Sequence, residues 1–251
     1  MSTEDRWAAA RREVEEASRH YYYSPQQVGI DRTTKRFVIE RCRSWILPVD
    51  LLDLGYVDGD WSHEALTLGC RVDIVEGAAG HVERARSEYA RVPAVRVFHA
   101  LFQEFEPDRQ YETVIAGDML RYVPDPVAFL ARAREWLRPN GHLIVTVPNS
   151  RSLHRRIGAV MGLESTPDAP NQRDVEVGNL RAYDRYQLRA ELRAAGFDVV
   201  ALNGCFLKPL SSSQMEQWTD DLLRAFLTIG DELQDYCWFI YALCSKPAKD
   251  V

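Results

Sequence analysis

The stretch 51–62, "LLDLGYVDGDWS", decides the fold of this chain. An apolar run reaches Asp53, Gly55 permits a tight turn, and Gly59 lets the backbone approach a ligand closely before a helix opens. Val57 stands between the two glycines, and we expect it to be tolerated there if its φ is negative. The stretch therefore predicts a strand, a tight turn and a helix, the unit from which parallel sheets are built.

Composition limits the classes of protein to which the chain can belong. At 251 residues, 46% apolar and 27% charged, it can bury a sizeable core. A net charge of −6 and a pI near 5.6 argue against nucleic-acid binding. The charged start and the lack of a membrane-length apolar run predict a cytoplasmic protein that does not use a membrane. Scattered cysteines predict reduced thiols and no metal site.

Short apolar runs alternate with helical stretches from residue 49 onward. The expected strands are "VDLLDL", "RVDIVEG", "AVRVFHA", "YETVIAGD", "GHLIVTVPN" and, later, "FDVVALNGCFL" and "YCWFIYALCSK". The expected helices lie at about 61–68, around 82–89, and at about 127–137, 185–195 and 214–229. Apolar strands that alternate with helices are typical of a parallel sheet covered on both faces.

Two segments lie outside that alternation. An amphipathic helix is expected up to about Arg19. It ends in "YYYSP", where Pro25 prevents simple continuation of the helix, and a second helix is expected at about 33–45. We interpret residues 1–46 as an N-terminal helical cap on a domain at 47–251. Residues 150–183 have helical and loop character without a strand, and we interpret them as an insertion in that domain.

Glu76, together with the first turn, indicates which class of ligand the chain binds. In parallel sheets ligands bind beyond the carboxyl ends of the strands, and Glu76 ends the second strand, where its carboxylate can accept hydrogen bonds from ribose hydroxyls. The spacing of Asp53, Gly55 and Gly59 differs from a dinucleotide fingerprint, and the acid would repel a pyrophosphate. A carboxylate at the first turn suits a ligand with an ammonium group and no phosphate. This favours S-adenosylmethionine (SAM).

From about residue 20 onward the chain resembles class I SAM-dependent methyltransferases, particularly a bacterial small-molecule subgroup. The resemblance rests on "ALFQEFEPDRQYETVIAGDMLRYVPDPVAFLARAREWLRPNGHLIVTVPNSRSLHRRIGAVMGL" and on "FLKPLSSSQM". It implies a Rossmann-like α/β fold with a mostly parallel sheet of seven strands, in which the last strand is antiparallel. It also implies that Asp53, Gly55, Gly59, Glu76, Leu101, Phe102, Asp118 and Met119 bind the cofactor. Gly77 and Tyr23 are further candidates for cofactor binding.

The chain departs from the family pattern where a general base is expected. "GDMLRYV" has Asp118, Arg121 and Tyr122 where relatives often carry histidine and glutamate, and "GNLRAY" lacks a second histidine. A base is needed mainly when the acceptor must lose its proton early. The remaining candidates for catalytic residues are Asp118, Asn149, His154, Tyr22 and Tyr183.

Three functions follow from these residues. The first is methyl transfer from SAM to an oxygen or nitrogen of a small molecule in specialised metabolism. The second uses SAM as the sole substrate: its amino group attacks the carbon beside sulfur and yields azetidine-2-carboxylate and methylthioadenosine. Tyrosine faces such as Tyr22 and Tyr23 would attract the sulfonium, and Asp118 or Asn149 would orient the amine. The third is a non-catalytic partner protein. The sequence does not distinguish a monomer from a homodimer.

Overall fold

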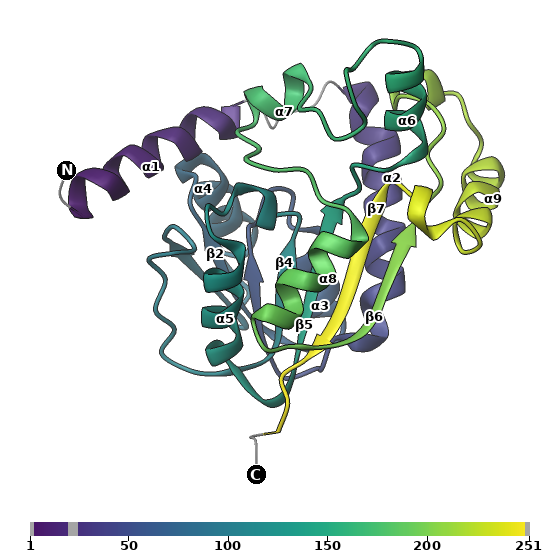
Figure 1. Cartoon of the computed structure of the whole chain (residues 1–251). Coiled ribbons are helices and arrows are strands. Elements are labelled where there is room, and N and C mark those ends of the chain that lie inside the picture. Colours follow the sequence, from purple (N-terminus) through teal and green to yellow (C-terminus); the bar gives the residue numbers. More distant parts are fainter. Residues whose placement is uncertain (1–2, 20–24, 249–251) are drawn as a thin grey trace.

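The computed structural model describes residues 3–19 and 25–248 (Figure 1). Its core is a sheet of seven strands in the order β3-β2-β1-β4-β5-β7-β6. β1 to β5 are parallel, and β7 is antiparallel to both of its neighbours, as the resemblance implied. The strands are β1 (Asp50–Leu54), β2 (Arg71–Glu76), β3 (Val95–His99), β4 (Tyr111–Gly117), β5 (Leu137–Pro148), β6 (Asp198–Cys205) and β7 (Phe239–Ser245).

Helices cover both faces of the sheet because successive side chains of a strand point to opposite sides. Leu52 of β1 packs in the core layer beneath α5 and α8, whereas Leu51 packs in the layer beneath α2 and α3. Figure 1 shows α5 and α8 in front of the sheet and α2 behind it. The helices that cover the sheet are α2 (Pro25–Cys42), α3 (Asp60–Thr67), α4 (Ala79–Glu88), α5 (Pro126–Trp136), α8 (Arg185–Ala194) and α9 (Asp220–Gly230).

The predicted positions of two helices were wrong. α2 begins at Pro25, because a proline in the first turn of a helix loses no hydrogen bond there. The helix expected at 214–229 is divided into a short turn, η3 (Ser213–Met215), and α9. Thr219 caps α9 by accepting a hydrogen bond from Leu222 N at 3.3 Å, which starts a new helix at Asp220.

Three further helices lie above the carboxyl edge of the sheet (Figure 1). They are α1 (Thr3–Arg19), α6 (Leu153–Val160) and α7 (Gln172–Glu176). The segment predicted as an insertion contains α6 and α7, and its ends meet where Ser150 N donates to Tyr183 O at 2.7 Å. The short turns are η1 (Arg43–Trp45), η2 (Leu120–Tyr122) and η4 (Gln234–Tyr236).

The two N-terminal helices have different roles. Phe37, Val38 and Cys42 of α2 are buried in the core. α1 instead lies over the sheet edge, where Arg11 contacts Glu104 at 2.9 Å and Glu15 accepts a hydrogen bond from Ala79 N at 2.6 Å. Glu15 thereby satisfies an N–H group in the first turn of α4. None of the helices in the described part of the chain is long and apolar enough to cross a membrane.

Candidate active site

The turn after β1 has the strained backbone that glycine normally relieves. Gly55 and Gly59 have φ of 95° and 76°. Val57 has a φ of 45°, so the negative φ under which a valine would be readily tolerated is not found here. A β-branched residue in the left-handed region is unusual, because its Cβ crowds the backbone. The turn therefore keeps the shape of a glycine loop with a valine at its middle position.

Gly59 serves packing in this structure. A Cβ at this position would lie 2.7 Å from the ring of Tyr56, closer than real Cβ contacts. The Tyr56 hydroxyl donates to Glu88 on α4, and its ring packs edge-on against Tyr89. Gly59 does not line the cavity described below. The structure thus shows a close approach of Gly59 to Tyr56, and the approach of its backbone to a ligand stays a prediction.

Helix α2 braces the outer side of the same turn. Lys35 forms an ion pair with Asp58, and Arg32 approaches Asp60 at 3.4 Å. Although burial disfavours the charge on Lys35, Asp58 raises the pKa of Lys35 above its usual value. These contacts fix the turn that follows β1.

Glu76 is held at the end of β2 by three groups. Its carboxylate accepts hydrogen bonds from Tyr56 N at 3.0 Å and Ala78 N at 2.8 Å, and His81 Nδ1 lies 3.5 Å from Oε2. Burial opposes the charge on Glu76, but His81 and the two backbone donors lower its pKa below the usual range. Oε1, which accepts from Ala78 N, has a further lone pair that can accept from a ligand hydroxyl.

A cavity of about 470 Å³ opens above these residues, and we call it the cofactor cavity. The predicted cofactor residues that line it are Gly55, Glu76, Gly77, Leu101, Phe102, Asp118 and Met119. α1 closes one side of the cavity, and a Cβ at Gly77 would approach Val14 at 3.2 Å. Tyr22 and Tyr23 lie outside the described residues.

The charge of the cofactor cavity suits a cation. Its lining includes the carboxylates Glu13, Glu16, Glu76, Asp118 and Glu176, and no lysine or arginine among the residues that the structure describes. Opposite charge within a few ångströms stabilises a cation, most strongly away from solvent. A sulfonium ligand therefore complements this lining.

Asp53 lies beneath the turn and is absent from the cavity lining. Its Oδ2 accepts a hydrogen bond from Ser62 at 2.5 Å, and its buried Oδ1 has no partner among the described residues. Burial raises the pKa of Asp53 to about 7, although the Ser62 hydrogen bond lowers it. Contact between Asp53 and the methionine end of SAM stays a prediction.

Asp118 follows β4 with a φ of 61°. Its Oδ2 accepts from Arg121 Nη2 at 2.7 Å, and its Oδ1 is buried without a partner among the described residues. Burial raises the pKa of Asp118, and the charge of Arg121 offsets part of that rise. Asp118 is thus a carboxylate at the cofactor cavity whose basicity is above the usual range.

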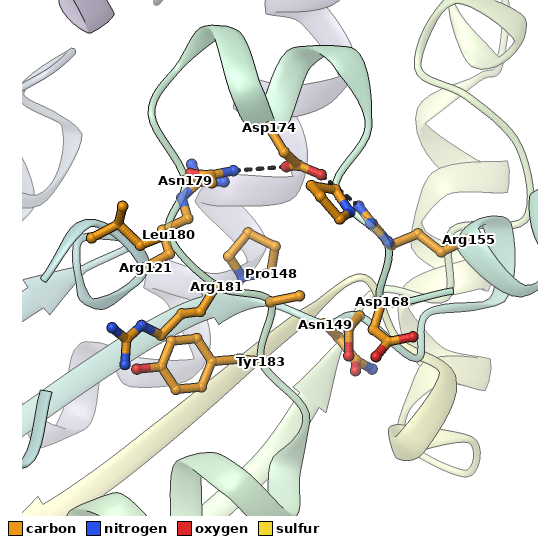
Figure 2. Close-up of a pocket in the computed structure, with 13 residues that line it drawn as sticks. Arg121, Pro148, Asn149, Arg155, Asp168, Asp174, Asn179, Leu180, Arg181 and Tyr183 are labelled. Carbon is orange, nitrogen blue, oxygen red and sulfur yellow. Dashed lines mark hydrogen bonds and ion pairs between the residues drawn. The ribbon is translucent and has the colours of Figure 1, made fainter. Parts of the chain in front are cut away.

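A second cavity, of about 230 Å³, adjoins the first (Figure 2). Leu180 lines both cavities, and Asp118 of the first is ion-paired with Arg121 of the second. The second cavity is formed by the end of β5, Arg121 and residues from 150–183. Its position beside Asp118 makes it the candidate site for a second substrate.

The side chains of Asn149 and Tyr183 line the second cavity but serve the fold. Asn149 Nδ2 donates to Cys237 O at 2.8 Å and to Asp235 O at 3.0 Å, and its Oδ1 accepts from Arg151 N. The Tyr183 hydroxyl donates to Glu191 of α8 at 2.8 Å, and its ring forms part of the cavity wall. Both polar groups are thus occupied by contacts outside the cavity.

His154 lies apart from both cavities. Its ring packs edge-on against Trp238, and His154 N donates to Lys208 O. Burial, Lys208 and Arg155 lower the pKa of His154 to about 3. A histidine that stays neutral and lines neither cavity is poorly placed to act as the general base.

Comparison with known proteins decides the family. A family described as "Methyltransferase domain" matches residues 15–202. The chain belongs to this family. The fold and the family confirm the resemblance to class I SAM-dependent methyltransferases, with SAM as the cosubstrate.

Individual relatives are more distant. The chain is 30% identical over 167 residues to a ubiquinone biosynthesis O-methyltransferase of Azorhizobium caulinodans, covering 64% of this chain and 63% of that protein. It is 29% identical over 174 residues to a trans-aconitate 2-methyltransferase of Enterobacter sp., covering 66% and 63%. A SAM-dependent methyltransferase of Mesorhizobium loti has a TM-score of 0.63 at 17% identity, covering 86% of this chain and 100% of that one. The chain thus spans less than two thirds of these curated relatives.

The residues of the cofactor cavity fit SAM. A volume of about 470 Å³ is within the range of small-molecule sites. Glu76 retains acceptor capacity for ribose hydroxyls, and Leu101 and Phe102 offer an apolar surface for adenine. The acidic lining complements the sulfonium.

The sequence alone indicated no role at this site for His81, Val14, Asn179 or Leu180. His81 contacts Glu76 from the first turn of α4, and Val14 of α1 lines the cavity. Asn179 and Leu180 border the second cavity from an irregular segment. The apolar periodicity of α1 was visible, but no pattern in the sequence shows which face of the sheet edge a cap helix will cover.

Proposed function

We propose that this protein transfers a methyl group from SAM to an oxygen or nitrogen of a small molecule held in the second cavity. The observation that carries the proposal is the adjoining pair of cavities, which meet at Leu180 and at the Asp118–Arg121 ion pair. Two substrates held side by side react as if at very high concentration. A role in specialised metabolism stays a prediction.

The residues of this chain would position the two substrates. Bound SAM supplies a methyl group already activated by its sulfonium. Glu76 would hold the ribose, and α1 would cover the cavity through the contacts of Arg11 and Glu15. Asp118 would stand between the substrates, where its raised pKa suits it to accept a proton from the methylated product. The named relatives, an O-methyltransferase of ubiquinone biosynthesis and a trans-aconitate methyltransferase, support a small-molecule acceptor.

Cyclisation of SAM is the weaker candidate. That reaction needs one substrate and leaves the second cavity without a role. A non-catalytic partner protein is weaker still, because the family match and the ordered Glu76 site support an enzyme.

Product analysis separates these reactions. The protein is incubated with SAM alone and with SAM plus a panel of small amino- and hydroxybenzoates, and the products are measured by mass spectrometry. We expect S-adenosylhomocysteine (SAH) to form only with an acceptor that is methylated in the same reaction. Methylthioadenosine from SAM alone would establish cyclisation instead. Failure to bind SAM in calorimetry would refute both reactions.

A further inference from the structure

Most polar groups around the second cavity are already used by the protein. Arg155 donates to Pro167 O, Ala169 O and Asp174, so its guanidinium holds the segment 167–174 in place. Arg181 donates to Val123 O and Pro124 O. Its Nε lacks a partner among the described residues, but Figure 2 shows its guanidinium beside the hydroxyl end of Tyr183, away from Asp168 and Asn149. The arginines therefore do not form a ready site for an anion.

At the boundary between the cavities, two polar atoms have no hydrogen-bond partner among the described residues, and both are acceptors. Asn179 Oδ1 and Asp118 Oδ1 are both buried and lack partners among the described residues. A buried polar atom without a partner costs about 1–3 kcal/mol. A donor on a bound ligand would remove that cost.

The orientation of Asn179 is determined by its neighbour. Asn179 Nδ2 donates to Asp174 Oδ1 at 2.7 Å, as Figure 2 shows. Asp174 is held in turn by Asn171 N at 3.0 Å and Arg155 at 3.2 Å. A carboxylate accepts hydrogen bonds, so the amide NH₂ must face Asp174 and the amide oxygen must face away from it.

Asp118 and Asn179 belong to one connected wall. Leu180 N donates to Arg121 O at 2.9 Å, and Arg121 donates to Asp118 Oδ2 at 2.7 Å. Gly178 and Leu180, on either side of Asn179, line the cofactor cavity, whereas Asn179 lines the second one.

From this wall, and resting on the function proposed above, we infer that the acceptor is an amine held through its N–H groups by Asp118 Oδ1 and Asn179 Oδ1. A primary amine offers two N–H donors to two acceptors, and its lone pair remains for attack on the methyl group. A hydroxyl would satisfy only one of the two acceptors, and a carboxylate would satisfy neither. Asn179 is thus a positioning residue that also determines acceptor specificity.

An amine that binds in its neutral form needs no base before the transfer. The nitrogen lone pair forms the new N–C bond while the S–C bond breaks, and SAH leaves with the sulfur electron pair. The methylated nitrogen is then an ammonium, and it releases one proton to the Asp118 carboxylate or to water. This order explains why the histidines absent from "GDMLRYV" and "GNLRAY" are not required.

Sinefungin tests the inference without knowledge of the acceptor. In this SAM analogue an amine-bearing carbon replaces the methylated sulfur, so its ammonium occupies the place of the transferred methyl group. We expect sinefungin to bind the wild-type protein at least about tenfold more tightly than SAH in calorimetry, the effect of about 1.4 kcal/mol. In Asn179→Leu this ratio should fall severalfold, while the affinity for SAH changes less than about twofold.

Two further variants keep the test falsifiable. Asn179→His retains a donor for Asp174 and an acceptor nitrogen for the ligand, so it should restore the ratio. Asn203→Leu on β6, which removes a hydrogen bond to Tyr241 of β7, is the matched control and should leave the ratio unchanged. Tight binding of SAH with a ratio that Asn179→Leu does not alter would overturn this inference alone. If the wild-type protein bound neither SAH nor sinefungin, the proposed function would be overturned.

Discussion

The two cavities of this protein arise from different parts of its structure. The cofactor cavity lies at the carboxyl ends of the parallel strands, where Gly55 and Asp118 follow β1 and β4 and Glu76 ends β2. The second cavity depends on the irregular segment 150–183, whose shape is held by contacts such as Arg155 with Pro167 O and Asp174 with Asn179. Sheet topology therefore forms the cofactor cavity, whereas side-chain contacts within an irregular segment form the second cavity.

Loss of the Glu76 carboxylate should affect the cofactor cavity most strongly. In Glu76→Gln the new NH₂ must face Tyr56 N or Ala78 N, two donors that the carboxylate now satisfies. We expect SAM to bind about 100-fold more weakly in calorimetry, the effect of about 2.8 kcal/mol. Glu83→Gln, on the exposed side of α4, is the control and should bind normally. Unchanged affinity in Glu76→Gln would show that the ribose lies elsewhere.

A bulky residue in the second cavity should separate turnover from cofactor binding. Ala182 lines the second cavity and is absent from the lining of the first. Ala182→Phe should fill much of the 230 Å³ volume and lower the rate of methyl transfer at least about tenfold, with the Kd of SAM within about twofold of wild type. Ala131→Phe, on the exposed face of α5, controls for the added ring. Equal losses of binding and turnover would mean that the cavities are not functionally distinct.

The sequence predicted more of the cofactor cavity than of the second cavity. Apolar strand runs and the spacing of Asp53, Gly55 and Glu76 were enough for the sheet and the cofactor, because the sheet edge is set by backbone topology. The roles of His154 and Tyr183 could not be predicted, because their burial against Trp238 and Glu191 depends on distant elements. Asn179 was noted only as a missing histidine, since its orientation depends on Asp174.

The raised pKa of Asp53 makes stability depend on pH. Its pKa is about 7 in the folded protein and 3.8 as the ordinary value, so the folded state binds more protons between those values. The free energy of unfolding should therefore fall as pH rises from about 4 to about 7. In denaturant titrations of the ligand-free protein, the free energy of unfolding of the wild type should decrease by on the order of 2 kcal/mol over this pH range. This decrease should be absent in Asp53→Asn. An Asp53→Asn variant with the wild-type pH dependence would contradict the burial argument.

Val57 should give the smallest effect. Glycine at this position relieves a φ of 45°, a gain of about 1–2 kcal/mol, against about 0.5–1 kcal/mol of added chain entropy. Val57→Gly should raise Tm by about 1–4 °C in calorimetry. Val200→Gly, at an exposed position on β6, should lower Tm instead. A lower Tm in both variants would show that Val57 is not strained.

The most direct test of the two-cavity account is a crystal structure of the protein with SAM. We expect ribose hydroxyls on Glu76 and adenine beside Leu101 and Phe102, with the methyl group directed past Asp118 toward Leu180 and the second cavity. A methyl group directed toward α1, with protein filling the space between it and Asn179, would contradict the account.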